Sequence, residues 1–483
     1  MKKAVWLLTL GYCELIGMKA NNEWKPEEWK IRNLHAIFHP KSIAVIGASR
    51  EPGKIGHIIV KNFIDGGYAG KIYPINPFAN EVLGLKTYSH ISEVPGEIDS
   101  AIIAIPAALV PQALEECGKR GVKGAVIISG GFGEIGKTKL EQQIASISNK
   151  YKIATIGPNC MGVLTPSDRN DSIFLPLYKM GRPKVGDISF ISQSGAVGGC
   201  IIDLAARAGV GIGKFISYGN AAVINEADLL AYLAHDEKTR VVVAYLEGVR
   251  EGRAFMQAAK MVTKKKPLIV LKAGKTSAGQ AAAKSHTGAL AGSPEVYEGV
   301  FKQCGITEAN TLTELFDFAK IFDIKECGSG KIAVITNGGG SGVLAADHIE
   351  EFGLELAEFS TQTKNSLRKI LPPYTTVHNP VDLVGDADSS RYEKAIEIAA
   401  NDPNVDIIIV IVLFQTVGID ARVVPVIVKA AEKSPKPLVV VSTGGEYTEI
   451  QRRILDSYGV PTYPSPSSAV RSISKLVKYC NRK

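Results

Sequence analysis

Three places in the chain share one local pattern, and this pattern limits the possible folds more than any other feature. An apolar run ends in a turn rich in glycine, serine or asparagine, and a segment with helical spacing follows the turn. The three apolar runs are residues 42–47, 186–192 and 331–336. A strand, a glycine turn and a helix in this order are typical of a parallel sheet covered by helices on both faces. The sequence therefore predicts an α/β protein built from three doubly wound parallel sheets.

Further apolar runs define the extent of each block. Segments of helical spacing, such as 109–120, lie between them. These later runs lie at 101–106 and 124–130, at 241–246 and 267–271, and at 406–413 and 437–442. At roughly 100–200 residues per domain, 483 residues fit about three domains. We expect an N-terminal extension without assigned structure and then three domains, at residues 1–28, 29–165, 166–326 and 327–483.

Composition favours a soluble globular protein. Hydrophobic residues make up 45% of the chain and charged residues 22%, which is ordinary for this class. The net charge of +8 is mild for this length and the basic residues form no blocks, so we expect no nucleic-acid partner. The first residues imitate a signal peptide, but Gly11 interrupts the apolar run, and Met18 is an alternative start. No later apolar run is long enough to span a membrane, so we expect no membrane partner.

The seven cysteines form no recognisable framework. Their number is odd, and none lies in a Cys-x-x-Cys pair. This pattern argues against a disulfide framework and against a structural zinc site. We therefore expect no metal site in this chain and a cytoplasmic location, where thiols stay reduced.

Two of the three glycine-rich turns have features of anion sites. The first runs from Gly47 to Gly56 but lacks the G-x-G-x-x-G spacing of an NAD site, which favours a different phosphorylated adenine ligand. The second, Ser192-Gln193-Ser194-Gly195, offers hydroxyls and backbone amides at a helix start, which suits a phosphate. The alternatives stay open: the first turn could only link a strand to a helix, and hydroxyl N-caps alone explain many sequences like the second.

His286 and Glu247 are the candidate catalytic residues. His286 lies in Lys-Ser-His-Thr-Gly-Ala-Leu, after a small, polar stretch where a core histidine is not expected. A neutral imidazole is a good nucleophile. Glu247 follows the expected strand 241–246, at the sheet edge where open α/β proteins place active sites. The alternatives are a solvent-exposed histidine and a turn carboxylate in water.

Together these motifs resemble the α subunit of ADP-forming acyl-CoA synthetases, the ADP-forming acetate–CoA ligase family, over about residues 30–480. The motifs that carry the resemblance are Val-Ile-Gly-Ala-Ser at 45–49, Tyr-Pro-Ile-Asn-Pro at 73–77, Gly-Pro-Asn-Cys-Met-Gly at 157–162, Ser-Gln-Ser-Gly at 192–195, Tyr-Gly-Asn at 218–220, Tyr-Leu-Glu-Gly at 245–248 and Ser-His-Thr-Gly at 285–288. The resemblance implies a CoA-binding Rossmann domain followed by two flavodoxin-like domains.

The resemblance also implies a reaction. Phosphate attacks acyl-CoA to give acyl phosphate and CoA, a histidine takes the phosphoryl group, and ADP receives it to become ATP. The motif match places the phosphorylated histidine at His286 and the carboxylate that steadies it at Glu247. It places CoA or acetyl-CoA at Ser49, Pro52, Gly53, Lys54, Ile55, Ile128, Ser129 and Gly130, and phosphate at Ser194, Gly195, Ala196, Asn337, Gln415 and Thr416.

Two departures bear on ligands and partners. Phe78 stands where many relatives have a basic residue, which puts one charge contact to CoA in doubt. The expected strands end near Ser442, which leaves too few residues for an ATP-grasp domain. We therefore expect a separate ATP-grasp β subunit in an α2β2 assembly, which holds most of the ADP or ATP and Mg²⁺.

Two other functions remain as alternatives. One is a CoA-sensing or acyl-CoA-sensing module without turnover, which the intact His286 and Glu247 disfavour. The other is a succinyl-CoA synthetase-type ligase, which the third block disfavours. The acyl group stays open between acetyl, branched-chain and aryl acids.

Overall fold

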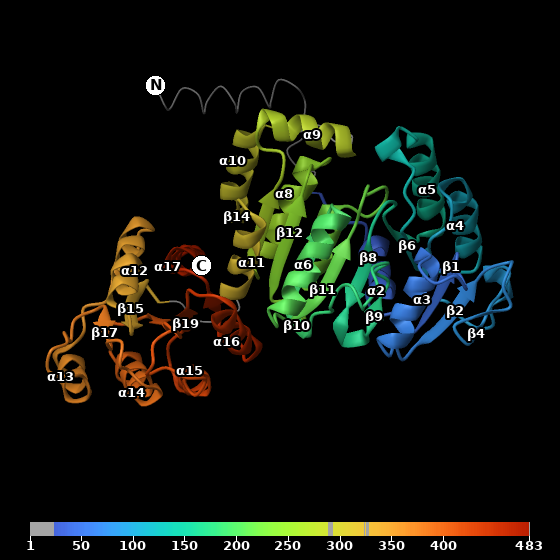
Figure 1. Ribbon diagram of the computed structural model, residues 1–483. Coiled ribbons are helices and arrows are strands. Elements are labelled where there is room, and N and C mark those ends of the chain that lie inside the picture. Colours follow the sequence, from blue (N-terminus) through green and yellow to red (C-terminus); the bar gives the residue numbers. More distant parts are fainter. Residues whose placement is uncertain (1–23, 288–292, 323, 325–327, 483) are drawn as a thin grey trace, which may run out of the picture.

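The protein is described by a computed structural model that covers residues 24–287, 293–322, 324 and 328–482. Its strands form a five-stranded, a seven-stranded and a six-stranded sheet, with a two-stranded β3–β4 ribbon (Glu81–Val82 and Leu85–Lys86) in the first domain. The three sheets follow one another along the molecule, and helices cover them (Figure 1). The predicted α/β class is therefore confirmed. Residues 1–23 of the expected N-terminal extension, including Met18, lie outside the described residues.

The first sheet has the strand order β2-β1-β5-β6-β7, all parallel. Every residue of β1 is buried, because alternate side chains enter cores on opposite faces of the sheet. Ile43 and Val45 pack with helices α2 and α3, and Ala44 and Ile46 pack with α4. The elements are α2 Glu28–Phe38, β1 Ser42–Ile46, α3 Ile55–Asp65, β2 Lys71–Ile75, β5 Ser100–Ile103, α4 Val110–Lys119, β6 Gly124–Ile127, α5 Thr138–Tyr151 and β7 Ala154–Ile156.

The second sheet has the order β14-β13-β12-β10-β11-β8-β9. Strands β10 to β14 are parallel, whereas β8 and β9 add antiparallel strands at the free edge of β11. The expected boundary after residue 165 differs from this arrangement, since β8 already belongs to the second sheet. The elements are β8 Gly162–Thr165, β9 Asn170–Asp171, β10 Val185–Ser192, α6 Gly195–Arg207, β11 Ile212–Ser217, α7 Glu226–His235, β12 Val241–Leu246, α8 Gly252–Thr263, β13 Leu268–Lys272, α9 Ser277–Thr287, α10 Pro294–Cys304, β14 Thr307–Ala309 and α11 Leu312–Ile321.

The third sheet has the order β16-β15-β18-β19-β20, and β17 pairs with the end of β15. The expectation that the last strand ends near Ser442 was wrong, because β20 follows it. The elements are β15 Lys331–Thr336, α12 Gly339–Glu351, β16 Glu355–Leu356, α13 Thr361–Ile370, β17 Val381–Asp382, α14 Ser389–Ala400, β18 Ile407–Ile411, α15 Val423–Lys433, β19 Leu438–Val441, α16 Glu446–Ser457, β20 Thr462–Tyr463 and α17 Pro466–Cys480.

The second and third sheets share one hydrophobic core. Phe190 of the second sheet and Val334 of the third belong to the same buried cluster. Helix α11 packs against α17, where Arg471 and Glu314 form an ion pair of 2.5 Å and Tyr463 donates a hydrogen bond to the Asp317 carbonyl at 3.0 Å. These contacts fasten the third domain to the side of the second.

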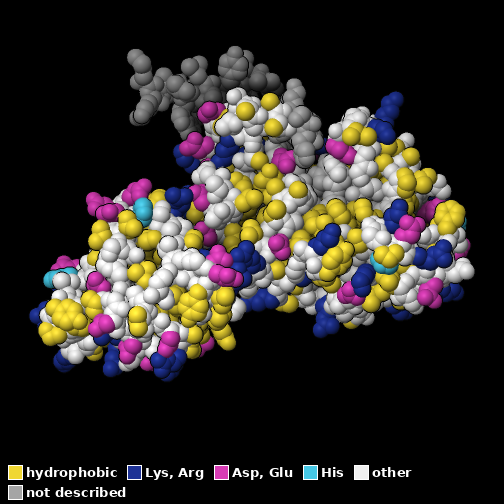
Figure 2. Space-filling model, in the orientation of Figure 1, with side chains coloured by type: hydrophobic (Ala, Val, Ile, Leu, Met, Phe, Trp, Pro, Cys, Tyr) yellow, Lys and Arg dark blue, Asp and Glu magenta, His cyan; other side chains and the backbone are white. Residues whose placement is uncertain are grey.

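The surface carries both signs of charge, and one of the described cysteines is disulfide-bonded. Basic and acidic side chains are interspersed over the face shown in Figure 2. Cys117, Cys160, Cys200 and Cys304 are free thiols, whereas Cys480 is disulfide-bonded, which the cysteine pattern did not predict. In the part of the chain that the structure describes, every helix is too short or too polar to cross a membrane.

Candidate active site

A cavity of about 1230 Å³ lies between the first and second domains. Its lining comes from segments that follow the carboxyl ends of parallel strands in both sheets: residues 104–106 after β5, 128–130 after β6, 193–196 after β10 and 248–250 after β12. Open α/β sheets bind ligands at this edge. Two sheets therefore contribute the same kind of edge to one cavity.

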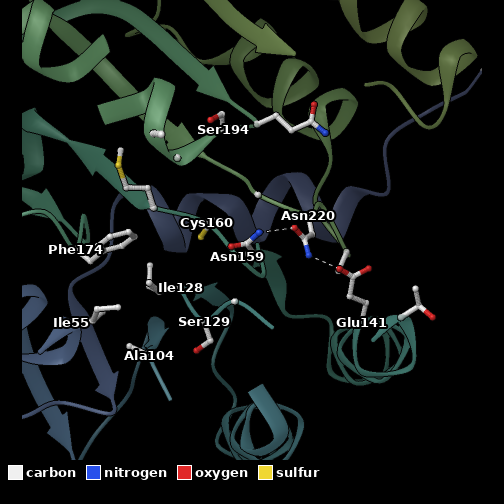
Figure 3. Close-up of a pocket in the computed structure, with 18 of the residues that line it drawn as sticks. Ile55, Ala104, Ile128, Ser129, Glu141, Asn159, Cys160, Phe174, Ser194 and Asn220 are labelled. Carbon is white, nitrogen blue, oxygen red and sulfur yellow. Dashed lines mark hydrogen bonds between the residues drawn. The ribbon is translucent and has the colours of Figure 1, made fainter. Parts of the chain in front are cut away.

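The cavity has an apolar side and a polar side (Figure 3). Ile55, Ala104, Ile128 and Phe174 form the apolar side. On the polar side, Asn220 donates hydrogen bonds of 2.6 Å to Glu141 and to Glu134, and it accepts one of 3.2 Å from Asn159.

Glu134 is held ionised by the polar network. Burial opposes its charge, but hydrogen bonds from the Gly131 backbone, from Asn220 and from the Phe132 backbone outweigh this effect and lower its pKa. The sequence placed Asn159 and Asn220 only in family motifs, and the structure brings them together across the boundary between the domains.

Gly219 makes this close approach possible. Its φ angle is +54°, in the left-handed region that favours glycine. A Cβ atom there would lie 2.3 Å from the carbonyl oxygens of Pro158 and Asn159. Only glycine therefore lets the loop after β11 lie against the loop before β8.

The cavity includes four of the eight residues predicted to contact CoA: Ile55, Ile128, Ser129 and Gly130. Ser49, Pro52, Gly53 and Lys54 are not among its lining residues. They lie in the loop that leads from β1 to Ile55, the first residue of α3, and Pro52 to Lys54 are exposed. The Arg50 side chain on this loop donates to the carbonyl of exposed Phe78 at 3.5 Å. A cation missed by the sequence reasoning thus lies next to the Phe78 position.

The predicted phosphate residues fall into two separate groups. Ser194, Gly195 and Ala196 form the start of α6 and line the cavity. Ser194 is the N-cap, and its hydroxyl accepts a hydrogen bond from the Val197 backbone at 3.4 Å. The free N–H groups of such a first turn form an anion site.

The second group lies at the carboxyl edge of the third sheet, and none of its members lines the cavity. Asn337 donates to the Thr416 hydroxyl at 2.9 Å, and Gln415 donates to the Thr443 carbonyl at 3.0 Å. The structure therefore does not bring Asn337, Gln415 and Thr416 together with Ser194 in one cavity.

Glu247 lies just past the end of β12 and is 8% exposed. Gln193 fixes its backbone, because the side-chain oxygen of Gln193 accepts hydrogen bonds from the Glu247 nitrogen at 2.7 Å and the Gly248 nitrogen at 3.0 Å. Lys272 donates to the Glu247 carbonyl at 2.9 Å. Burial, and then the charge of Glu247, raise the pKa of Tyr245 to about 12. The sequence named Glu247 but missed the part played by Gln193.

His286 lies in α9, which contacts the short 3-10 helix η3 (Gly133–Ile135) beside the cavity. Helix α9 and helix α5 both lie along the upper side of the view in Figure 1. The His286 side chain, together with Gly288 to Leu290 of its motif, lies outside the described residues. The structure thus places the backbone segment of His286 near the site and says nothing of its imidazole.

A second buried carboxyl, that of Glu226, acts electrostatically on the same tyrosine as Glu247 does. Glu226 is 3% exposed, and burial raises its pKa to about 7, against the opposing charge of Arg250. The charges of Glu226 and Glu247 both act on Tyr218, whose pKa burial already raises well above its ordinary value. The Tyr218 hydroxyl has no hydrogen-bond partner among the described residues.

Three family models match the chain in the order of the three sheets. A CoA binding domain matches residues 41–166, a succinyl-CoA ligase like flavodoxin domain matches 185–322, and a Ligase-CoA domain matches 332–477.

Individual relatives resemble the chain over most of its length. It is 42% identical to the acetate–CoA ligase [ADP-forming] I subunit alpha of Pyrococcus furiosus, over 92% of this chain and 98% of the relative. It is also 42% identical to acetate–CoA ligase [ADP-forming] I of Archaeoglobus fulgidus, but spans only 64% of that longer protein. Among solved structures, the dinucleotide forming acetyl-coenzyme A synthetase 1 of Ca. Korarchaeum cryptofilum, in complex with phosphate and ADP, is 36% identical with a TM-score of 0.87. That likeness covers 93% of this chain and 97% of the solved one.

Proposed function

The chain belongs to the ADP-forming acetate–CoA ligase family, and we propose from this premise that it acts as the α subunit of such an enzyme. The reaction converts an acyl-CoA, ADP and phosphate into a carboxylic acid, ATP and CoA. The observation that carries the proposal is the cavity between the first two domains. Part of the predicted CoA site and the start of α6 line the same cavity, so a thioester and an anion can meet there.

In the first step, a phosphate oxygen attacks the thioester carbonyl carbon. The carbon–sulfur bond breaks, the sulfur leaves as the thiolate of CoA and takes up a proton, and an acyl phosphate remains. The backbone N–H groups of Gly195 and Ala196 suit the phosphate, since they belong to the first turn of α6. Ser129, Gly130 and Ile128 lie across the cavity and suit the CoA arm.

In the second step, a nitrogen of His286 attacks the phosphorus of the acyl phosphate. The bond from phosphorus to the carboxylate oxygen breaks, so the free acid leaves and a phosphohistidine forms. Glu247 accepts a hydrogen bond from the other imidazole nitrogen, which orients the ring and favours its positive charge in the transition state. In the third step, an oxygen of the β-phosphate of ADP attacks the phosphorus, and the phosphorus–nitrogen bond breaks to give ATP.

The remaining assignments belong to the same proposal. Lys54, together with Ser49, Pro52 and Gly53, holds the phosphorylated end of CoA at the cavity rim. Asn337, Gln415 and Thr416 bind the phosphoryl group when the His286 segment lies at a second position, away from the cavity. The three domains are divided as the sequence predicts, apart from β8, and the protein works in the cytoplasm.

We also propose an ATP-grasp β subunit in an α2β2 assembly, which supplies most of the site for ADP and Mg²⁺. One fact supports the separate subunit, and another supports the ligands. This chain matches 98% of a relative named as a subunit alpha but only 64% of a longer relative with the same activity in its name. A solved relative was obtained with phosphate and ADP, which supports these two ligands.

The test is ATP formation by this chain together with a candidate ATP-grasp β subunit. Acetyl-CoA, a branched-chain acyl-CoA and an aryl-CoA are each supplied with phosphate, Mg²⁺ and ADP. The proposal predicts ATP in amounts equal to the CoA released, and none with His286→Ala. CoA binding without ATP formation from any of these substrates would instead support a CoA-sensing module.

A further inference from the structure

Gln193 contacts two parts of the site at once. Its backbone nitrogen donates to the Tyr245 carbonyl at 3.1 Å, which extends the β10–β12 pairing past the end of β10. Its side-chain oxygen accepts the hydrogen bonds from the Glu247 and Gly248 backbones described above. The same side chain belongs to the lining of the cavity, next to Ser194. Gln193 therefore joins the turn that carries Glu247 to the cavity wall.

The hydrogen-bond network determines which way the amide of Gln193 faces. Both backbone neighbours are N–H donors, so the side-chain oxygen must face them. The side-chain nitrogen then faces away from the turn. Among the residues that the structure describes, no acceptor receives a hydrogen bond from this nitrogen. Two N–H donors thus remain without a partner, in a half-buried side chain beside the start of α6.

We propose that Gln193 is a positioning residue with two separable functions: its amide oxygen holds the Glu247 turn, and its amide nitrogen donates to an oxygen of the acyl phosphate. This inference rests on the proposed function and adds a residue to its site. The nitrogen adds one more N–H donor to those of Gly195 and Ala196. These donors lie where negative charge develops during the reaction.

Glutamine is the side chain that meets both needs. A glutamate would still offer an oxygen to the two backbone donors, but its second oxygen would place negative charge beside an anionic ligand. A methionine has similar length and neither an acceptor nor a donor. The two functions can therefore be removed separately, with Gln193→Glu for the donor alone and Gln193→Met for both.

The experiment measures kcat and the KM for phosphate of the complete assembly with its β subunit. We expect Gln193→Glu to raise the phosphate KM by about tenfold or more, because a hydrogen bond to an anion is replaced by a repulsion. We expect its melting temperature to stay near that of wild type, since the backbone hydrogen bonds survive. Gln193→Met raises the same KM and also lowers kcat by about tenfold or more, because the Glu247 turn is released.

The matched control is Gln143→Glu, which makes the same change at an exposed position of α5 outside the cavity lining. A phosphate KM in Gln193→Glu equal to that of Gln143→Glu would overturn the inference. So would a kcat loss in Gln193→Glu as large as in Gln193→Met, because the two functions would then not be separable. A wild-type assembly that forms no ATP would instead refute the proposed function.

Discussion

The side-chain oxygen of Gln193 lies 2.7 Å from the backbone nitrogen of Glu247. This hydrogen bond joins the ends of β10 and β12, two neighbouring strands of the second sheet. It holds the Glu247 backbone in place without using the Glu247 carboxylate. The carboxylate can therefore be altered while its backbone stays anchored, which makes the first prediction possible.

Glu247→Gln removes the negative charge and keeps the size of the side chain. We expect kcat for ATP formation to fall by about a hundredfold or more, because the phosphohistidine loses its charge partner. Single-turnover phosphoryl transfer to the chain measures this loss. Glu298→Gln is the control, since Glu298 pairs with Lys302 at 2.8 Å on the exposed face of α10. Equal rates in the two variants would remove Glu247 from the mechanism.

Gly219→Ala tests the close approach of the two loops. The added methyl group would meet backbone oxygens at 2.3 Å, at a positive φ angle, and backbone cannot move aside as a flexible side chain can. We expect a loss of about 1–3 kcal/mol in the free energy of unfolding and weaker CoA binding. Gly252→Ala is the matched control, since its Cβ would meet nothing within 4 Å. The measurements are thermal unfolding and CoA titration of both variants. Similar melting temperatures and CoA affinities for Gly219→Ala and Gly252→Ala would mean that the loop tolerates the strain.

Much of the fold could be predicted because buried parallel strands are continuous apolar runs. The predicted run 241–246 and the observed strand β12 have the same bounds, as do 331–336 and β15. The missed strands include β2, of five residues, and β11, of six, as well as two-residue strands such as β9 and β20. Two residues show no periodicity, and their pairing depends on a neighbour that is distant in sequence.

The site could be predicted only where a motif carries the function locally. Ile128, Ser129, Gly130 and the start of α6 follow strands directly and line the cavity, whereas their contacts with CoA and phosphate stay predictions. Asn220 and Gln193 were missed as site residues because their functions depend on partners in other segments, Glu141 and Glu247. No spacing in the sequence indicates such contacts.

Glu226 makes stability depend on pH. Burial raises its pKa from 4.5 to about 7, so the folded protein holds this proton more tightly than the unfolded chain does. The resulting stability is complete below pH 4.5 and is lost as the pH rises through 7. We expect this loss to amount to roughly 3–4 kcal/mol. As the pH rises between these values, the urea concentration at the midpoint of unfolding should therefore fall more for wild type than for Glu226→Gln. Glu298→Gln serves again as the control for a changed carboxylate, and a difference between wild type and Glu226→Gln that does not vary with pH would contradict the assignment.

The proposed reaction depends on passage of the phosphoryl group through His286 of this chain. The most direct measurement incubates the chain with labelled phosphate, an acyl-CoA and the β subunit without ADP, and then follows the label on the chain. We expect an acid-labile, alkali-stable label on wild type, its transfer to ADP on addition of the nucleotide, and no label on His286→Ala. A label that persists in His286→Ala, or no label with acetyl-, branched-chain or aryl-CoA, would contradict the proposed reaction.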